Sequence, residues 1–92
     1  MNTFVFSRFV KKRFENLPLS SQKRITQKLR SLKENPYIFS LLKTLHNFEP
    51  ATHRLRIGDF RLILELQHQK GDDALFFVLD VDLRKDVYMG KH

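Results

Sequence analysis

The chain has 92 residues, of which 41% are hydrophobic and 29% charged, a composition typical of one small globular domain and not of a disordered segment. It contains no cysteine, which excludes disulfides, thiolate nucleophiles and cysteine zinc sites. Its 17 Lys and Arg outnumber its 10 Asp and Glu, for a net charge of +7. We therefore expect a single domain over residues 1–92. With no basic start followed by a long apolar stretch, we expect a cytoplasmic protein that does not enter a membrane.

The positive charge is concentrated in the first half of the chain. Residues 1–46 hold ten Lys and Arg against two Glu, whereas residues 47–92 hold seven basic against eight acidic side chains. A basic half favours a polyanionic partner, which leaves nucleic acid, an anionic membrane surface and an acidic protein segment as alternatives. The remaining interpretation is that these side chains only keep a helix surface hydrated.

The N-terminal half predicts a strand and two helices. Thr3–Phe6 is β-branched and aromatic, as in a short strand, and Ser7 is a plausible N-cap for the first helix. Apolar residues then recur at helical spacing until Pro18, at Val10, Phe14 and Leu17. A second helix, capped by Ser20 or Ser21 and ending near Asn35-Pro36, repeats this spacing at Ile25, Leu29 and Leu32. Residues 36–52 are less regular, and either a helical turn or a packed loop fits them.

From His53 onward the hydrophobic period is two, which predicts strands. Gly58-Asp59 separates two alternating runs and suits a two-residue type II′ turn, which fixes the register. Ile57 then faces Phe60, Leu55 faces Leu62, and Arg56 faces Arg61. One face of this hairpin is apolar and is expected to pack against the helices, with Leu55, Ile57, Phe60, Leu62 and Leu64.

The remaining C-terminal residues predict a loop and one more strand. Gln67–Asp73 is polar and reads as a loop, and Ala74–Asp82 is nearly all apolar, as in a central strand buried on both faces. The order β-α-α-β-β-β predicts an α+β fold in which two N-terminal helices pack on a small, mostly antiparallel sheet.

Three arginines share the polar face of the predicted hairpin. Arg54, Arg56 and Arg61 point to one side, and two of them lie directly opposite each other. Like charges directly opposite each other on two paired strands are destabilising by about a few tenths of a kcal/mol, so stability alone does not favour this arrangement. An anion-binding cluster, aimed at phosphates or carboxylates, is one interpretation. Arginines on a hydrated face, partly neutralised by acidic neighbours, are the other.

Other candidate sites are weaker. Asp80 and Asp82 share one strand face, but no third carboxylate accompanies them, and the four histidines lack metal-ligand spacing. We therefore expect no metal and no cofactor. Tyr88, beside Arg84 and Lys85, is either an amphipathic plug against the sheet or a phenol that stacks on a base or takes part in proton transfer.

Two segments resemble a known superfamily. The hairpin sequence HRLRIGDFRLILEL at 53–66 and the tail VLDVDLRKDVY at 78–88 are similar to the "YRLRxGDYRxxYE" hairpin and "xxxHRKxVY" terminus of RelE/ParE toxins from bacterial type II toxin–antitoxin systems. LKTL at 42–45 also matches the family's "LKxL" element. The resemblance spans nearly the whole chain.

The resemblance implies a RelE-like domain that enters the ribosome and cleaves mRNA without a metal, using the RNA 2′-hydroxyl as nucleophile. Basic residues on the sheet and a C-terminal Tyr or His serve the chemistry in such toxins. The matching positions, taken as the catalytic set, are Arg54, Arg56, Arg61, Arg84 and Tyr88. The lysines expected to bind RNA are Lys23, Lys28, Lys43 and Lys85. The implied partners are a cognate antitoxin, the ribosome with its mRNA and, through the antitoxin complex, operator DNA.

Two positions depart from the family pattern. Leu83 stands where many members have His, and Asp82 stands where some ribosome-dependent nucleases have a cation. The first change removes a proton-transfer group, and the second places negative charge beside the expected phosphate site. A ParE-like inhibitor of DNA gyrase without catalysis, and an inactive relative that acts through antitoxin binding, are therefore the alternatives to an mRNA endonuclease.

Overall fold

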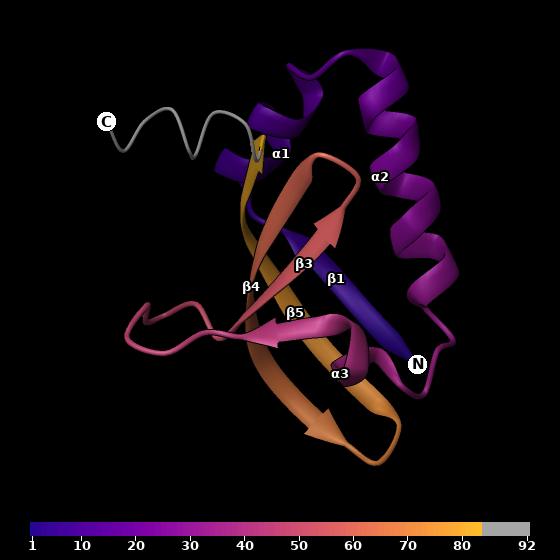
Figure 1. Ribbon diagram of the computed structural model, residues 1–92, viewed down its shortest axis with the longest axis vertical. Helices are drawn as coiled ribbons and strands as arrows, with labels where there is room; N and C mark the ends of the chain where they lie inside the picture. Colours follow the sequence, from indigo (N-terminus) through magenta and orange to yellow (C-terminus); the bar gives the residue numbers. More distant parts are fainter. Residues whose placement is uncertain (84–92) are drawn as a thin grey trace.

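The computed structural model describes residues 1–83, which form a five-stranded sheet in the order β1-β5-β4-β3-β2 with helices packed on it (Figure 1). The strands are β1 (Asn2–Phe6), β2 (Leu42–Thr44), β3 (His53–Ile57), β4 (Phe60–Lys70) and β5 (Asp73–Leu83). The helices are α1 (Arg8–Glu15), α2 (Leu19–Leu32) and α3 (Ile38–Leu41). β1 runs parallel to β5 and the other neighbouring strands are antiparallel. The predicted α+β fold is confirmed. Among residues 1–83, no helix is long and apolar enough to span a membrane.

The first helix begins as the sequence predicts, and the second does not. The Ser7 hydroxyl accepts a hydrogen bond from the Val10 N–H at 3.2 Å, as an N-cap should. The predicted cap of α2 at Ser20 or Ser21 is wrong, because Pro18 occupies the N-cap position and the helix starts at Leu19. The proline ring fixes φ near the helical value, here −54°, and the Pro18 carbonyl accepts the first helical N–H bonds.

The segment at 36–52, for which the sequence left two choices, contains both a helical turn and a strand. α3 is followed at once by β2, which pairs with β3 so that Leu42 lies opposite Leu55. A loop at 45–52 then returns the chain to β3. The loop is anchored at both ends, since the Leu45 N–H bonds to the Thr52 carbonyl at 2.9 Å and the Thr52 N–H bonds to the Leu64 carbonyl at 2.8 Å.

The β3–β4 hairpin has the predicted turn and register. Ile57 pairs with Phe60, and Arg56 pairs with Arg61. Gly58 has φ 58°, the sign that a type II′ turn requires of its first central residue. The predicted apolar face is buried throughout, at Leu55, Ile57, Phe60, Leu62 and Leu64.

Two predictions for the last third of the chain are wrong. The polar segment Gln67–Asp73 is not a loop, because β4 continues to Lys70 and only Gly71-Asp72 turns the chain. Its residues are polar because this end of the hairpin extends past the core into solvent. β5 is also not buried on both faces: its inner side chains are buried, whereas Phe77 on the outer face is 39% exposed. No described helix covers that outer face.

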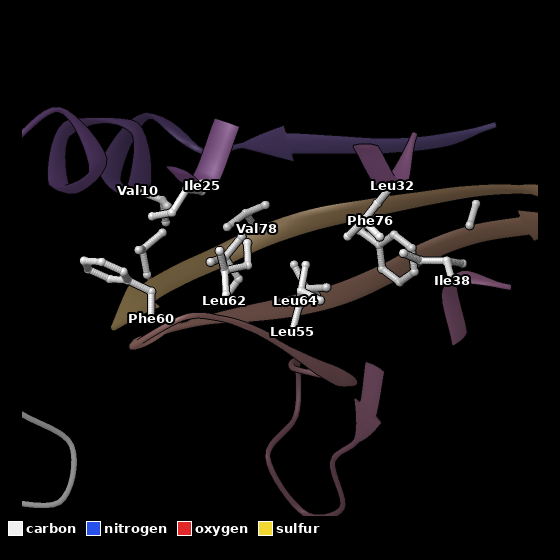
Figure 2. Packing of buried hydrophobic residues seen from close by; sticks show 13 residues of the cluster. Val10, Ile25, Leu32, Ile38, Leu55, Phe60, Leu62, Leu64, Phe76 and Val78 are labelled. Carbon is white, nitrogen blue, oxygen red and sulfur yellow. The ribbon is translucent and has the colours of Figure 1, made fainter. Parts of the chain in front are cut away.

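The core lies between the helices and one face of the sheet. Val10, Ile25 and Leu32 project from α1 and α2 toward the sheet (Figure 2). The side chains that meet them come mainly from the three central strands, with Ile38 of α3 at one end: Leu55, Leu62, Leu64, Phe76 and Val78 (Figure 2). All three helices therefore contribute to the same face, and the arginines of the hairpin lie on the other.

Candidate nucleic-acid interface

The open face of the sheet carries two cross-strand rows of charged side chains. In one row, Arg61 of β4 lies between Arg56 of β3 and Asp82 of β5. In the next row, Arg54 of β3 pairs with Lys43 of β2 on one side and with Ile63 of β4 on the other. The hairpin register places all these side chains on one face because residues two apart on a strand point the same way.

The loop at 45–52 turns part of this face into a cleft of about 620 Å³. Arg54, Arg61 and Ile63 line it from the sheet, and Lys43 lines it from the edge strand. The loop contributes the opposite side, with His46, Phe48 and Ala51 among its lining residues. The cleft is thus bounded by a rigid ladder and by a loop tied to that ladder by hydrogen bonds.

The cleft is positively charged with one acidic exception. Lys43, Arg54 and Arg61 bring three cations, and Asp82 is the one carboxylate among its lining residues. Arginine presents a planar fork of N–H donors that fits phosphate oxygens, and a cation on a strand is held in place better than one on a loop. The geometry can therefore bind a phosphate and stabilise negative charge that develops on it.

Asp82 is held from the other edge of its strand. β1 ends at Phe6, opposite Val78, so the last residues of β5 have no strand on that side among the described residues. Arg13 of α1 lies there instead, with its Nη2 3.3 Å from an Asp82 carboxylate oxygen and its Nε 3.3 Å from Asp80. Burial, followed by the neighbouring Asp80 carboxylate, raises the pKa of Asp82, while Arg13 and Arg61 act in the opposite direction.

The structure brings only some of the expected site residues together. Arg54, Arg61 and Lys43 line the cleft. Arg56 shares the face but is exposed and does not line it. Lys23 and Lys28 are exposed on α2, which packs on the opposite face of the sheet. Arg84, Lys85 and Tyr88 lie outside the described residues.

Sequence reasoning missed two residues of the cleft, His46 and Phe48. Phe48 is 64% exposed and lines the cleft from the loop, beside the basic side chains of the sheet. The turn-like composition Asn47-Phe48-Glu49-Pro50 was visible in the sequence. Nothing local in it indicated that this turn folds beside the arginines, because that contact depends on the pairing of β2 with β3.

Leu83, the other departure from the family pattern, belongs to the apolar side of the sheet. It pairs with Phe60 and packs against the core. Within residues 1–83, no three His, Asp or Glu side chains gather as metal ligands do.

Neither a protein-family model nor a curated protein sequence matches the chain. Solved structures do match over most of its length. A chain of the toxin–antitoxin complex RelBE2 from Mycobacterium tuberculosis is similar with a TM-score of 0.69 and 20% identity, over 89% of this chain and 96% of that one. This protein has the RelE fold.

Two archaeal structures support the same assignment. A chain of the RelB–RelE antitoxin–toxin complex from Methanococcus jannaschii is similar with a TM-score of 0.59 and 22% identity, over 94% of this chain and 96% of that one. A chain of the RelE–RelB complex from Pyrococcus horikoshii gives a TM-score of 0.62 and 19% identity, over 90% and 94%. The resemblance inferred from the hairpin and tail motifs is thus confirmed at the level of the fold.

Proposed function

We propose that this RelE-like chain is the toxin of a toxin–antitoxin pair and that it cleaves mRNA in the ribosome. The observation that carries the proposal is the basic cleft, which Arg54 and Arg61 line together from adjacent strands on the open face of a RelE fold. Two of the solved structures that match are complexes of RelE with RelB, which supports a cognate antitoxin as the protein partner here.

The proposed reaction needs no metal. The RNA 2′-hydroxyl gives its proton to a general base and attacks the adjacent phosphorus. The bond from phosphorus to the 5′-oxygen of the next nucleotide breaks, that oxygen takes a proton from a general acid, and a 2′,3′-cyclic phosphate remains. Arg54 and Arg61 stabilise the negative charge that builds on the phosphate oxygens. Lys43 contacts the RNA backbone beside them, and Arg56, Lys23 and Lys28 contribute to the attraction of RNA from outside the cleft.

Proton transfer is assigned to Tyr88, with Arg84 and Lys85 beside it in the sequence. His46 is a second candidate, because it lines the cleft and imidazole is the side chain that most often serves as a general acid or base. Two variants distinguish these assignments. Tyr88→Phe keeps the ring and removes the phenolic proton, whereas His46→Gln keeps a polar side chain without an exchangeable ring proton.

The antitoxin is expected to present an acidic segment with apolar residues. A net charge of +7 on so small a chain favours an acidic partner, but exposed ion pairs are each worth only about 0–1 kcal/mol. Such a segment therefore also buries apolar surface. The toxin acts in the cytoplasm, where ribosomes are, and reaches operator DNA through the antitoxin complex.

The proposal is tested by controlled expression in bacteria. Expression of the chain alone should arrest growth with translation stopped and mRNA cut at the ribosome, and co-expression of a cognate antitoxin should restore growth. Replication arrest with DNA damage and intact mRNA would instead assign the chain as a gyrase inhibitor. Normal growth with soluble, folded protein would assign it as an inactive relative.

A further inference from the structure

Arg13 contacts three consecutive groups on the uncovered edge of β5. Its Nε lies 3.3 Å from an Asp80 carboxylate oxygen and its Nη2 lies 3.3 Å from an Asp82 carboxylate oxygen. The same Nη2 donates to the Val81 carbonyl at 3.4 Å. One guanidinium on α1 thus spans both acidic side chains of the strand and the backbone between them.

Arg13 and Asp82 belong to two different surfaces. Asp82 lines the basic cleft and is the cross-strand partner of Arg61. Arg13 does not line that cleft, because it approaches β5 from the side of α1. The Arg13 side chain is 48% exposed and that of Asp82 is 29% exposed, so the charge of each is screened only in part by solvent.

An unneutralised Asp82 opposes the binding of an anion in the cleft. Its carboxylate repels a phosphate placed beside Arg61 and competes with that phosphate for the Arg61 guanidinium. A cation on the far side of the carboxylate reduces both effects, because it neutralises the charge and holds the side chain toward the edge of the sheet.

We propose that Arg13 is a positioning residue for the anion cleft, which it controls from outside by pairing with Asp82 and Asp80. This inference rests on the proposed function, because it takes the RNA phosphate to be the anion that the cleft binds. Asp82 is then a negative determinant of RNA affinity, and Arg13 offsets it without touching the RNA.

The experiment measures the affinity for a fluorescein-labelled 2′-O-methyl RNA hexamer, which lacks the attacking hydroxyl and stays intact. Arg13→Met should weaken binding about threefold to fivefold and Asp82→Asn should strengthen it by a similar factor, the range of a partly exposed charge pair. In the Asp82→Asn background, Arg13→Met should change the logarithm of the dissociation constant for RNA by less than half as much as it does in the parent. Arg13→Lys, which keeps the charge, should lie between the parent and Arg13→Met.

The matched control is Lys12→Met, which removes one positive charge from the same helix. Equal losses of affinity for Arg13→Met and Lys12→Met, or an undiminished effect of Arg13→Met when Asp82 is Asn, would overturn the inference. Thermal melts of each variant confirm that the fold is kept.

An NMR titration of the Asp82 carboxyl separates this inference from the proposed function. The Asp82 pKa should be higher in Arg13→Met than in the parent or in Lys12→Met, since Asp80, Arg61 and Arg13 are the charged groups that act on it. If the parent does not bind the hexamer, the link between Arg13 and RNA affinity fails, whereas the proposed function is decided separately by cleavage of mRNA on ribosomes. An Asp82 pKa unchanged in Arg13→Met would overturn the pairing of Arg13 with Asp82, and a raised pKa would support it.

Discussion

Arg61 and Asp82 lie directly opposite each other on β4 and β5, at the edge of the basic cleft. Because Arg61 also faces Arg56 on β3, its charge has one repulsive and one attractive neighbour across the ladder. The two contributions to stability oppose each other. This opposition agrees with the proposal that the arginines of this row bind an anionic ligand.

The glycine of the hairpin turn should be less tolerant of substitution than the glycine of the β4–β5 turn. Both have positive φ, 58° at Gly58 and 57° at Gly71, so alanine costs about 1–2 kcal/mol at either position. A methyl group at Gly58 would in addition stand 3.0 Å from Arg24 Nη1, whereas at Gly71 it meets nothing within 4 Å. Urea denaturation should show Gly58→Ala to be the more destabilised variant. Equal losses in the two variants would mean that the exposed Arg24 side chain moves aside without cost.

Acid should destabilise the fold through His53. Burial lowers the pKa of this imidazole below 6.5, and its ring packs against Phe39 and Phe76 at centroid distances of 5.5 and 6.1 Å. Below this pH the unfolded state therefore binds more protons than the folded state. The contribution of His53 to the free energy of unfolding is fully present above about pH 6.5 and is lost as the pH falls through the pKa of the folded state.

His53→Phe keeps an aromatic ring in this position and removes the titration. The melting temperature of the variant should fall less than that of the parent between about pH 7.5 and about pH 5.5. His68→Gln, which changes an exposed histidine on β4, is the control and should follow the parent. Parallel curves for the parent and His53→Phe would contradict the assignment.

Phe48 should contribute to RNA binding by stacking on a base. It is 64% exposed and borders a cleft with three cations, the combination found in single-strand binding surfaces. Phe48→Ala should weaken the affinity for single-stranded RNA about tenfold, the range of one lost stacking contact, with an unchanged melting temperature. Tyr37→Ala removes an aromatic ring that is 75% exposed before α3 and should leave the affinity unchanged. An equal loss in both variants would argue against a specific role of the loop.

The parts of the fold that could be predicted are those fixed by local pattern. The two-residue turn at Gly58-Asp59 sets the register of every pair in the hairpin, so the common face of Arg54, Arg56 and Arg61 followed from the sequence alone. Ser7 likewise had its N-cap partner three residues away.

The parts that could not be predicted depend on distant segments. The cleft exists because the loop at 45–52 lies over β3 and β4, and no periodicity encodes that contact. Arg13 reaches Asp82 across 69 residues of sequence, which only the packing of α1 beside β5 makes possible. The extension of β4 to Lys70 could not be predicted for a related reason: beyond the core a strand no longer needs apolar side chains, so its sequence looks like that of a loop.

The proposed role of Arg61, binding of the scissile phosphate, is tested most directly by cleavage of mRNA on programmed ribosomes by the parent, Arg61→Ala and Arg56→Ala. Both variants lose one arginine from the same cross-strand pair, and each should change stability by no more than about 0.5 kcal/mol. Arg61→Ala should slow cleavage on the order of 10²-fold or more, the scale of one lost charge-stabilising donor, and Arg56→Ala, outside the cleft, should slow it far less. Full cleavage by Arg61→Ala would contradict the account.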